Sequence, residues 1–316
     1  MSDTDSATDP DIVVLRAKAH GISTAGYAEA IRERLPEYTV RRAATPAEER
    51  ELIRSATVAT GMEVDEEVLE NAEQLRLFAG GAAGVDHLPM DQLKAHDVTV
   101  TNAAGVHVPT AAEHAIAGLL VLARRFDQAF RNHHEGHWRH FQTHGELADA
   151  TVTVVGLGTI GTRVAELLQA FGSEVIGVRH TPAKGGPADE VVGYDHADLH
   201  GAFARSDYVV LACPLTETTR GLVDWQAFRT LPTDAALVNI ARGPVIDTDA
   251  LVAALRDNLI RGAVLDVTDP EPLPDGHPLW GMDEVVVTPH VAGHTHAYWE
   301  RIADVLARNL ARVEET

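Results

Sequence analysis

Residues 151–171 hold the feature that most restricts the fold: a short β-branched run, three spaced glycines and then an amphipathic stretch. In a strand–turn–helix unit the first glycine (Gly156) permits a tight turn and the second (Gly158) lets a pyrophosphate approach the backbone. The third (Gly161) allows helix and strand to pack closely, and the helix N-terminus presents free N–H groups to phosphate. A glycine-rich turn without a ligand is the alternative, but the flanking strand and helix favour a dinucleotide site. The full fingerprint is Gly156, Leu157, Gly158, Thr159, Ile160 and Gly161.

Compact apolar runs alternate with stretches of helical spacing along the whole chain. Before the fingerprint, strands are expected in 11–18, 38–40, 56–60, 75–80 and 98–101, with a helix over 24–35. From residue 151 on, the runs are TVTVVG, SEVIGV, YVVLAC, ALVNIA, GAVLDV and EVVVTP. We expect one long helix over 109–131, a loop or short helices over 133–144 and a closing helix over 294–312. The pattern predicts an α/β fold with two doubly wound, Rossmann-like parallel sheets.

The charge balance restricts the partners. The formal charge is −21, from 47 acidic and 26 basic residues, and only three of the basic residues are lysines. Such a field repels nucleic acid and anionic membranes. A large acidic excess with few lysines is typical of proteins from a salt-saturated cytoplasm, where a Debye length of roughly 3 Å screens self-repulsion. We therefore expect a halophilic, archaeal source; an ordinary acidic protein is the alternative.

Other segments bear on the compartment. No run of about 18 apolar residues is present, and the acidic N-terminus does not look like a signal peptide. The single cysteine, Cys213, cannot form an internal disulfide. A soluble cytoplasmic protein is expected, with Cys213 as a small buried side chain.

The residues after the second strand of the fingerprint unit bear on the cofactor. An acidic residue at this point would bind the 2′-hydroxyl of NAD, but this chain has Arg179, His180 and Thr181. A cation and a hydroxyl suit a 2′-phosphate, so NADP(H) is preferred over NAD(H). The alternative is that Arg179 stacks on adenine and both cofactors work.

Three charged residues follow strands of the second half: Arg242, Glu271 and His290. Ligands of doubly wound sheets bind beyond the carboxyl ends of the strands, so the three could converge. Imidazole exchanges protons near neutral pH, a carboxylate can orient it, and a guanidinium can bind a carboxylate or polarise a carbonyl. A salt-bridged arginine, a surface glutamate and a capped histidine are the alternatives for each residue alone.

From about residue 70 on, the chain resembles the D-isomer-specific 2-hydroxyacid dehydrogenases, a group that includes glyoxylate/hydroxypyruvate reductases and D-3-phosphoglycerate dehydrogenases. The similar segments are GGAAGVDHL, TNAAGVHVPTAAEHAIAGLL, VVGLGTIG, CPLTETTRGLV, LVNIARGPVIDTDALVAAL, GAVLDVTDPEPLP and VVVTPHVAGHT. The resemblance implies reduction of a 2-keto acid to the D-2-hydroxy acid. It also implies that Arg242 binds substrate, that Glu271 pairs with His290 and that His290 is the acid/base.

The same resemblance implies further site residues and the domain arrangement. Amides around Ala83 and Gly84 are expected to bind the substrate carboxylate, and Asp266 to lie near the nicotinamide. A cofactor-binding domain over 103–290 is expected to be inserted in a substrate-binding domain formed by 1–102 and 291–316. The cofactor-binding set further includes Cys213, Pro214, Thr219, Ile240, Ala241, Arg242, His290 and Gly293.

Several alternatives stay open. The fold could serve a co-repressor-like protein that senses NAD(H), or a phosphite-type dehydrogenase. The histidines between His133 and His140 have spacing that could suit a metal, but no carboxylate completes a ligand set, so no metal is expected. Trp138 lies in a region that crosses a dimer interface in the resembled family, and a homodimer is expected. The sequence does not specify which 2-keto acid is the substrate.

Overall fold

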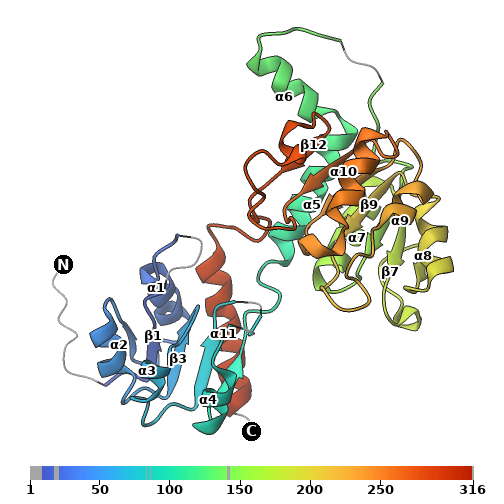
Figure 1. The fold of residues 1–316 in the computed structure, drawn as a ribbon. Coiled ribbons are helices and arrows are strands. Elements are labelled where there is room, and N and C mark those ends of the chain that lie inside the picture. Colours follow the sequence, from blue (N-terminus) through green and yellow to red (C-terminus); the bar gives the residue numbers. More distant parts are fainter. Residues whose placement is uncertain (1–8, 18–20, 83, 86, 141–142, 315–316) are drawn as a thin grey trace. The chain divides into compact units, whose positions relative to one another are not determined.

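The computed structural model describes residues 9–17, 21–82, 84–85, 87–140 and 143–314 (Figure 1). The chain divides into two compact units, each considered by itself. Unit 1 comprises Met1–Val106 and His294–Thr316, and unit 2 comprises His107–Gly293. The sequence placed the two crossings at residues 103 and 290, a few residues before those of the structure.

Unit 1 is a five-stranded parallel sheet with the order β2-β1-β3-β4-β5. The strands are β1 (Ile12–Val14), β2 (Val40–Arg42), β3 (Val58–Gly61), β4 (Leu77–Gly80) and β5 (Thr99–Thr101). The helices are α1 (Ala25–Arg34), α2 (Pro46–Leu52), α3 (Glu66–Leu69), α4 (Met90–Ala95) and α11 (Tyr298–Glu314). Alternate residues of β1 point to opposite faces, so that Ile12 packs with α1 and α11 while Val13 packs with α2, α3 and α4.

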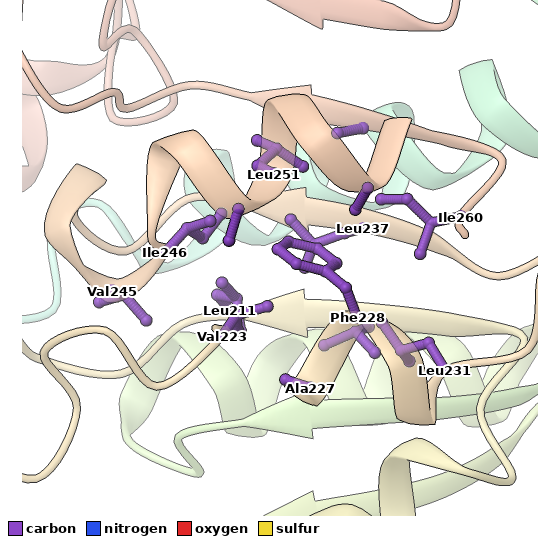
Figure 2. Packing of buried hydrophobic residues seen from close by; sticks show 14 of the residues in the cluster. Leu211, Val223, Ala227, Phe228, Leu231, Leu237, Val245, Ile246, Leu251 and Ile260 are labelled. Carbon is purple, nitrogen blue, oxygen red and sulfur yellow. The ribbon is translucent and has the colours of Figure 1, made fainter. Parts of the chain in front are cut away.

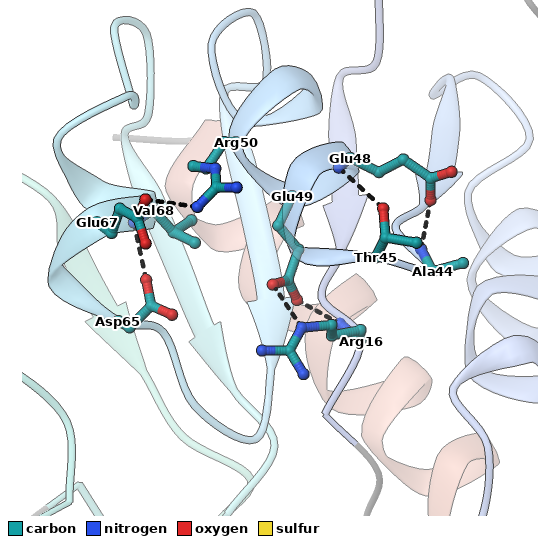
Figure 3. A network of polar contacts seen from close by, with 9 residues as sticks. All are labelled: Arg16, Ala44, Thr45, Glu48, Glu49, Arg50, Asp65, Glu67 and Val68. Atoms are coloured by element: carbon teal, nitrogen blue, oxygen red, sulfur yellow. Dashed lines mark hydrogen bonds and ion pairs between the residues drawn. The ribbon is translucent and has the colours of Figure 1, made fainter.

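Side-chain caps fix the starts of α2 and α3 in unit 1 (Figure 3). The Thr45 hydroxyl accepts from the Glu48 N–H at the start of α2, and the Asp65 carboxylate accepts from the Val68 N–H at the start of α3. Such caps satisfy backbone donors that a helix start leaves unpaired, and each contributes about 1 kcal/mol. The buried Glu49 carboxylate accepts from the backbone and side chain of Arg16, which ties α2 to the end of β1.

Unit 2 is a seven-stranded parallel sheet with the order β12-β11-β10-β9-β6-β7-β8. The strands are β6 (Thr151–Val155), β7 (Glu174–Val178), β8 (Glu190–Val192), β9 (Tyr208–Leu211), β10 (Ala236–Asn239), β11 (Gly262–Leu265) and β12 (Val285–Val287). The α-helices are α5 (Val108–Ala123), α6 (Phe126–His134), α7 (Thr159–Phe171), α8 (His196–Phe203), α9 (Trp225–Thr230) and α10 (Thr248–Arg256). Three short 3₁₀ helices are η1 (Pro182–Lys184), η2 (Gly243–Val245) and η3 (Pro278–Gly281). The two parallel sheets with covering helices confirm the predicted α/β fold class.

Apolar layers cover both faces of this sheet. Side chains of α5 and α7 pack on one face, with Val152 and Val154 of β6 beneath them. On the other face, Phe228 of α9 and Leu251 of α10 meet Leu237 of β10 in one layer (Figure 2). Complete burial of a side chain of this size contributes about 2–3 kcal/mol, so this layer holds the strand ends of the site in place.

The prediction of one helix over 109–131 is wrong. Helix α5 ends at Ala123, and Arg125 has a left-handed backbone with φ of 55° before α6 begins. The Ala123 carbonyl accepts from the Gly145 N–H, so it is paired with the returning chain at the point where the helix stops.

Within the described residues, no helix combines the length and apolarity needed to cross a bilayer.

Candidate active site

The carboxyl ends of all seven strands of unit 2 meet at one edge of the sheet, because the strands are parallel. The chain leaves the first strand, β6, toward β7 on one side and later toward β9 on the other. This reversal is the topological switch point at which doubly wound sheets bind ligands. In spatial order, the strand ends lead to Arg179 after β7, Gly156 after β6, Cys213 after β9, Arg242 after β10, Asp266 after β11 and His290 after β12.

The fingerprint glycines are required by close backbone approach. Gly156 has φ of 99°, and a Cβ there would lie 2.6 Å from the Cys213 Cα. A Cβ on Gly161 would lie 1.9 Å from the Gly156 oxygen, whereas one on Gly158 would meet no atom within 4 Å. Gly158 precedes the first residue of α7. The open space there fits a pyrophosphate at the helix N-terminus.

A pocket of about 240 Å³ opens beside the fingerprint. It brings together residues from the fingerprint, from the end of β7 and from the loop after β9, so it fits the adenosine and phosphate part of a dinucleotide. Its lining is Gly156, Leu157, Gly158, Arg179, His180, Thr181, Lys184, Tyr194, Pro214, Thr216, Thr218 and Thr219. The other predicted cofactor residues are outside this lining: Thr159, Ile160, Gly161, Cys213, Ile240, Ala241, Arg242, Asp266, His290 and Gly293.

The sequence reasoning missed Lys184 and Tyr194 in this pocket. Arg179 donates from Nη1 to the Gly185 carbonyl, which fixes its guanidinium beside the η1 turn that presents Lys184. Lys184 is one of three lysines in the chain, and its sequence position gave no signal for the pocket. Burial raises the pKa of Tyr194, so its phenol stays neutral beside the pocket.

Thr219 and Cys213 serve the pocket mainly by holding its shape. The Thr219 hydroxyl donates to the Pro214 carbonyl at 2.6 Å and accepts from the Thr216 N–H at 2.8 Å, which closes the loop after β9. Cys213 is buried against Gly156, and burial raises the pKa of its thiol to about 11. Cys213 therefore stays a neutral packing group at physiological pH.

Glu271 and His290 form a direct pair. The distance between His290 Nδ1 and Glu271 Oε1 is 2.7 Å, and both side chains are partly exposed, at 49% and 41%. A carboxylate bonded to Nδ1 fixes the orientation of the ring. Nε2 is then the nitrogen left to exchange a proton with a bound molecule; no described residue bonds to it.

Asp266 organises the backbone that presents His290. Its buried carboxylate accepts from the Thr288 hydroxyl at 2.6 Å and from the N–H groups of Val291 and Ala292 at 2.9 Å each. The Asp266 carbonyl also accepts from the His290 N–H. His290 itself has a φ of 53°, which is unusual for a residue other than glycine. The carboxylate of Asp266 therefore holds the loop around His290 in its conformation, a role that the sequence pattern did not indicate.

His114 of α5 extends this network. Its Nε2 lies 3.1 Å from the Thr288 hydroxyl and 3.6 Å from Asp266 Oδ1. The loop of His290 is thus fixed both to β11 and to α5.

The Arg242 loop packs on the Glu271 loop. A Cβ on Gly243 would lie 2.0 Å from the Thr268 oxygen, so only glycine fits after Arg242. The buried Asn239 amide donates to the Arg242 carbonyl and accepts from the Ala241 N–H. The exposed Arg242 guanidinium donates to the Ala241 carbonyl at 2.6 Å, so the structure places the loops together without a direct bond from Arg242 to the Glu271–His290 pair.

Three predicted positions remain: Ala83, Gly84 and Gly293. Ala83 is outside the described residues, and Gly84 is exposed after β4 of unit 1. The Gly293 carbonyl, at the last residue of unit 2, accepts from His107 Nδ1 at 3.1 Å. Among the described residues, no three His, Cys, Asp or Glu side chains gather in a way that could hold a metal ion.

Comparison with known proteins agrees with this geometry. Residues 116–292 match the model of the "D-isomer specific 2-hydroxyacid dehydrogenase, NAD binding domain". A glyoxylate reductase of Thermofilum pendens is 34% identical over 256 residues, which cover 79% of this chain and 75% of that protein. The structure of a D-isomer specific 2-hydroxyacid dehydrogenase from Xanthobacter autotrophicus Py2, in complex with NADPH and MES, is 30% identical with a TM-score of 0.76. It is matched over 98% of this chain and 96% of that chain.

A family protein of Aeromonas salmonicida gives the same result at 28% identity and a TM-score of 0.80, over 96% of each chain. The match extends over both units and includes the segments that hold the fingerprint and the Glu271–His290 pair. The chain belongs to the D-isomer-specific 2-hydroxyacid dehydrogenase family, a family of nicotinamide-dependent oxidoreductases.

Proposed function

We propose that this enzyme reduces a small 2-keto acid to the D-2-hydroxy acid, with His290 as the proton donor. The observation that supports this most directly is the 2.7 Å contact between His290 Nδ1 and Glu271 Oε1 at the carboxyl edge of the unit 2 sheet. The proposal agrees with the glyoxylate reductase activity named for the relative from Thermofilum pendens.

The roles follow from the chemistry of carbonyl reduction. When bound, the reduced nicotinamide supplies the hydride that the carbonyl carbon accepts. The carbonyl oxygen then needs a proton, and His290 Nε2 donates it while Glu271 holds the ring through Nδ1. Arg242 offers a planar pair of N–H donors for the substrate carboxylate or the keto oxygen. The amides around Ala83 and Gly84 are proposed to bind the substrate carboxylate.

We also propose a preference for NADPH over NADH. Arg179, Lys184 and His180 line one pocket, and no acidic side chain is among its lining residues. In a protein of charge −21, this local cationic group would attract the doubly charged 2′-phosphate. A strong preference for NADH would overturn this assignment.

The experiment is a spectrophotometric panel in molar KCl. Glyoxylate, hydroxypyruvate, pyruvate, phenylpyruvate and branched keto acids are each assayed with NADPH and with NADH. We expect cofactor oxidation with at least one acid and the higher kcat/KM with NADPH. Phosphite with NADP and NAD is run as a comparison. Turnover of phosphite alone would favour the phosphite-type alternative, and no turnover at all would favour a cofactor-sensing protein.

A homodimer through α6 is a further part of the proposal. Helix α6 and the segment that follows expose Phe130 at 64% and Trp138 at 92%, and Phe126 stacks on Phe130 with centroids 5.9 Å apart. Large aromatic side chains on a soluble protein's surface are typical of an association surface. A second copy of this chain is the proposed occupant.

A further inference from the structure

We propose that Tyr298 is a positioning residue for the substrate carboxylate: its hydroxyl fixes the peptide between Gly81 and Ala82 in unit 1. This rests on the proposed function, in which amides that follow Gly81 bind the carboxylate. Neither the sequence pattern nor the family resemblance indicated Tyr298.

The contact is direct and buried. The Tyr298 hydroxyl donates to the Gly81 carbonyl at 2.6 Å, and its side chain is 1% exposed. Burial raises the pKa of Tyr298 to about 12, so the hydroxyl keeps its proton and remains a donor throughout the physiological range. The same hydroxyl lies 3.6 Å from Met62 Sδ, at the end of the neighbouring strand.

Because a trans peptide is planar, the contact at the Gly81 carbonyl also sets the direction of the Ala82 N–H. The Gly81 carbonyl and the Ala82 N–H belong to one planar unit and point in opposite directions. With the carbonyl held toward Tyr298, the Ala82 N–H is directed away from it. Among the described residues, no acceptor lies in hydrogen-bond contact with the Ala82 N–H. We infer that this N–H can donate to the substrate carboxylate.

Backbone bonds also hold Gly81 and Ala82. The Gly81 N–H donates to the Gly61 carbonyl at 2.7 Å, and the Ala103 N–H donates to the Ala82 carbonyl at 2.9 Å. Both partners are backbone groups and cannot be removed by substitution. The bond from Tyr298 comes from a side chain, and it is therefore the contact that a substitution can test.

Helix α11 holds the phenol rigidly. Tyr298 is the first residue of α11, and Ile302, Ala303 and Leu306 are buried in the core with α1. The neighbouring Trp299 stacks on Tyr27 of α1 with ring centroids 4.8 Å apart. Helix α11 therefore holds the Gly81 carbonyl, which lies more than 200 residues earlier in the chain.

The test compares Tyr298→Phe with Tyr27→Phe. Tyr27 is a matched control, because it is fully buried in the same core and its hydroxyl bonds to Thr60 Oγ1, at 2.7 Å, rather than to Gly81. Each variant loses one buried phenol hydroxyl. We expect Tyr298→Phe to raise the KM for the best keto acid of the panel by about 3- to 10-fold, the effect of one lost hydrogen bond. The kcat and the KM for NADPH should stay within about twofold.

The outcomes are distinguishable. Melting temperatures that fall equally in both variants, with a keto-acid KM raised only in Tyr298→Phe, support the positioning role. Equal keto-acid KM values in the two variants would show that Tyr298 is only a core residue. Failure of the wild-type enzyme to reduce any keto acid would instead overturn the proposed function, and the inference with it.

Discussion

At the scale of single residues, the decisive contact of Asp266 is with backbone N–H groups rather than with another charge. One carboxylate gathers a hydroxyl and two amides from the loop that presents His290. A carboxylate that accepts several hydrogen bonds at once defines a loop conformation more strictly than packing alone, because each lost bond leaves a buried donor unpaired.

Asp266→Asn should therefore lower both stability and activity. The amide replaces an acceptor oxygen by an NH₂ group that confronts a backbone N–H. Loss of about 1.5–3 kcal/mol is expected, which lowers the Tm by about 2–5 °C in a protein of this size. The kcat should fall as His290 is displaced. Differential scanning fluorimetry and steady-state kinetics measure both.

Asp247→Asn is the control for this substitution, because Asp247 caps α10 through the Ala250 N–H and lies outside the His290 loop. It should leave both the Tm and kcat close to wild type, because asparagine caps a helix about as well as aspartate. An Asp266→Asn enzyme with the kcat of Asp247→Asn would contradict the role given to Asp266.

Cys213 should resist modification in the folded protein. Burial raises the pKa of its thiol to about 11, so at pH 8 only about one molecule in a thousand is in the reactive thiolate form. The reagent DTNB at pH 8 should titrate no thiol in the native state and one per chain in guanidinium chloride. Stoichiometric labelling of the native enzyme within minutes would show that the thiol is exposed or activated.

Residue types and their positions after strands could be predicted from sequence, but their partners could not. Arg242, Glu271 and His290 each follow an apolar run, and this repeated placement indicated a common site. The bonds of Asp266 to Val291 and of Tyr298 to Gly81 join segments that are distant along the chain. Such bonds leave no periodicity or characteristic spacing in the sequence, so they become visible only in the folded structure.

At the scale of elements, strands were predicted best where both faces are buried. The runs at β6, β7, β9, β10 and β11 are compact and apolar. Strand β8 (Glu190–Val192) was missed because it is a three-residue edge strand of intermediate exposure, so its sequence lacks a buried run. The end of α5 was missed because nothing in Arg124–Arg125 disfavours a helix; a tertiary bond to Gly145 coincides with its end.

The exposed aromatic side chains of α6 and its following segment should hold a dimer together. Phe130→Asp places a charge at an apolar contact and should convert dimer to monomer, as measured by light scattering after gel filtration in molar KCl. Trp225→Asp is the control, since Trp225 is an exposed aromatic residue on α9, outside this surface. A wild-type chain that is monomeric, or a Phe130→Asp protein that stays dimeric, would exclude this surface as the interface.

At the scale of the whole molecule, charge rather than topology is the unusual property. The alternating strand and helix patterns of the sequence predict the two parallel sheets. Because the strands of each sheet are parallel, their carboxyl ends lie at one edge. A net charge of −21 adds self-repulsion that low salt does not screen.

The Tm should therefore rise steeply with salt. Between 0.1 M and 2 M KCl we expect an increase of about 10 °C or more, corresponding to several kcal/mol of relieved repulsion. Most of the rise should occur with KCl and much less with an uncharged osmolyte of the same osmolality. A flat response to KCl would remove the expectation of a halophilic protein.

The proposed mechanism requires that His290, held by Glu271, donates the proton to the keto oxygen. The decisive measurement is the kcat of His290→Gln for the best keto acid, with His196→Gln on α8 as the matched control. We expect a kcat about 10²- to 10⁴-fold below wild type for His290→Gln, with NADPH binding unchanged, and a wild-type kcat for His196→Gln. A His290→Gln enzyme that retains kcat within about threefold of wild type would contradict it.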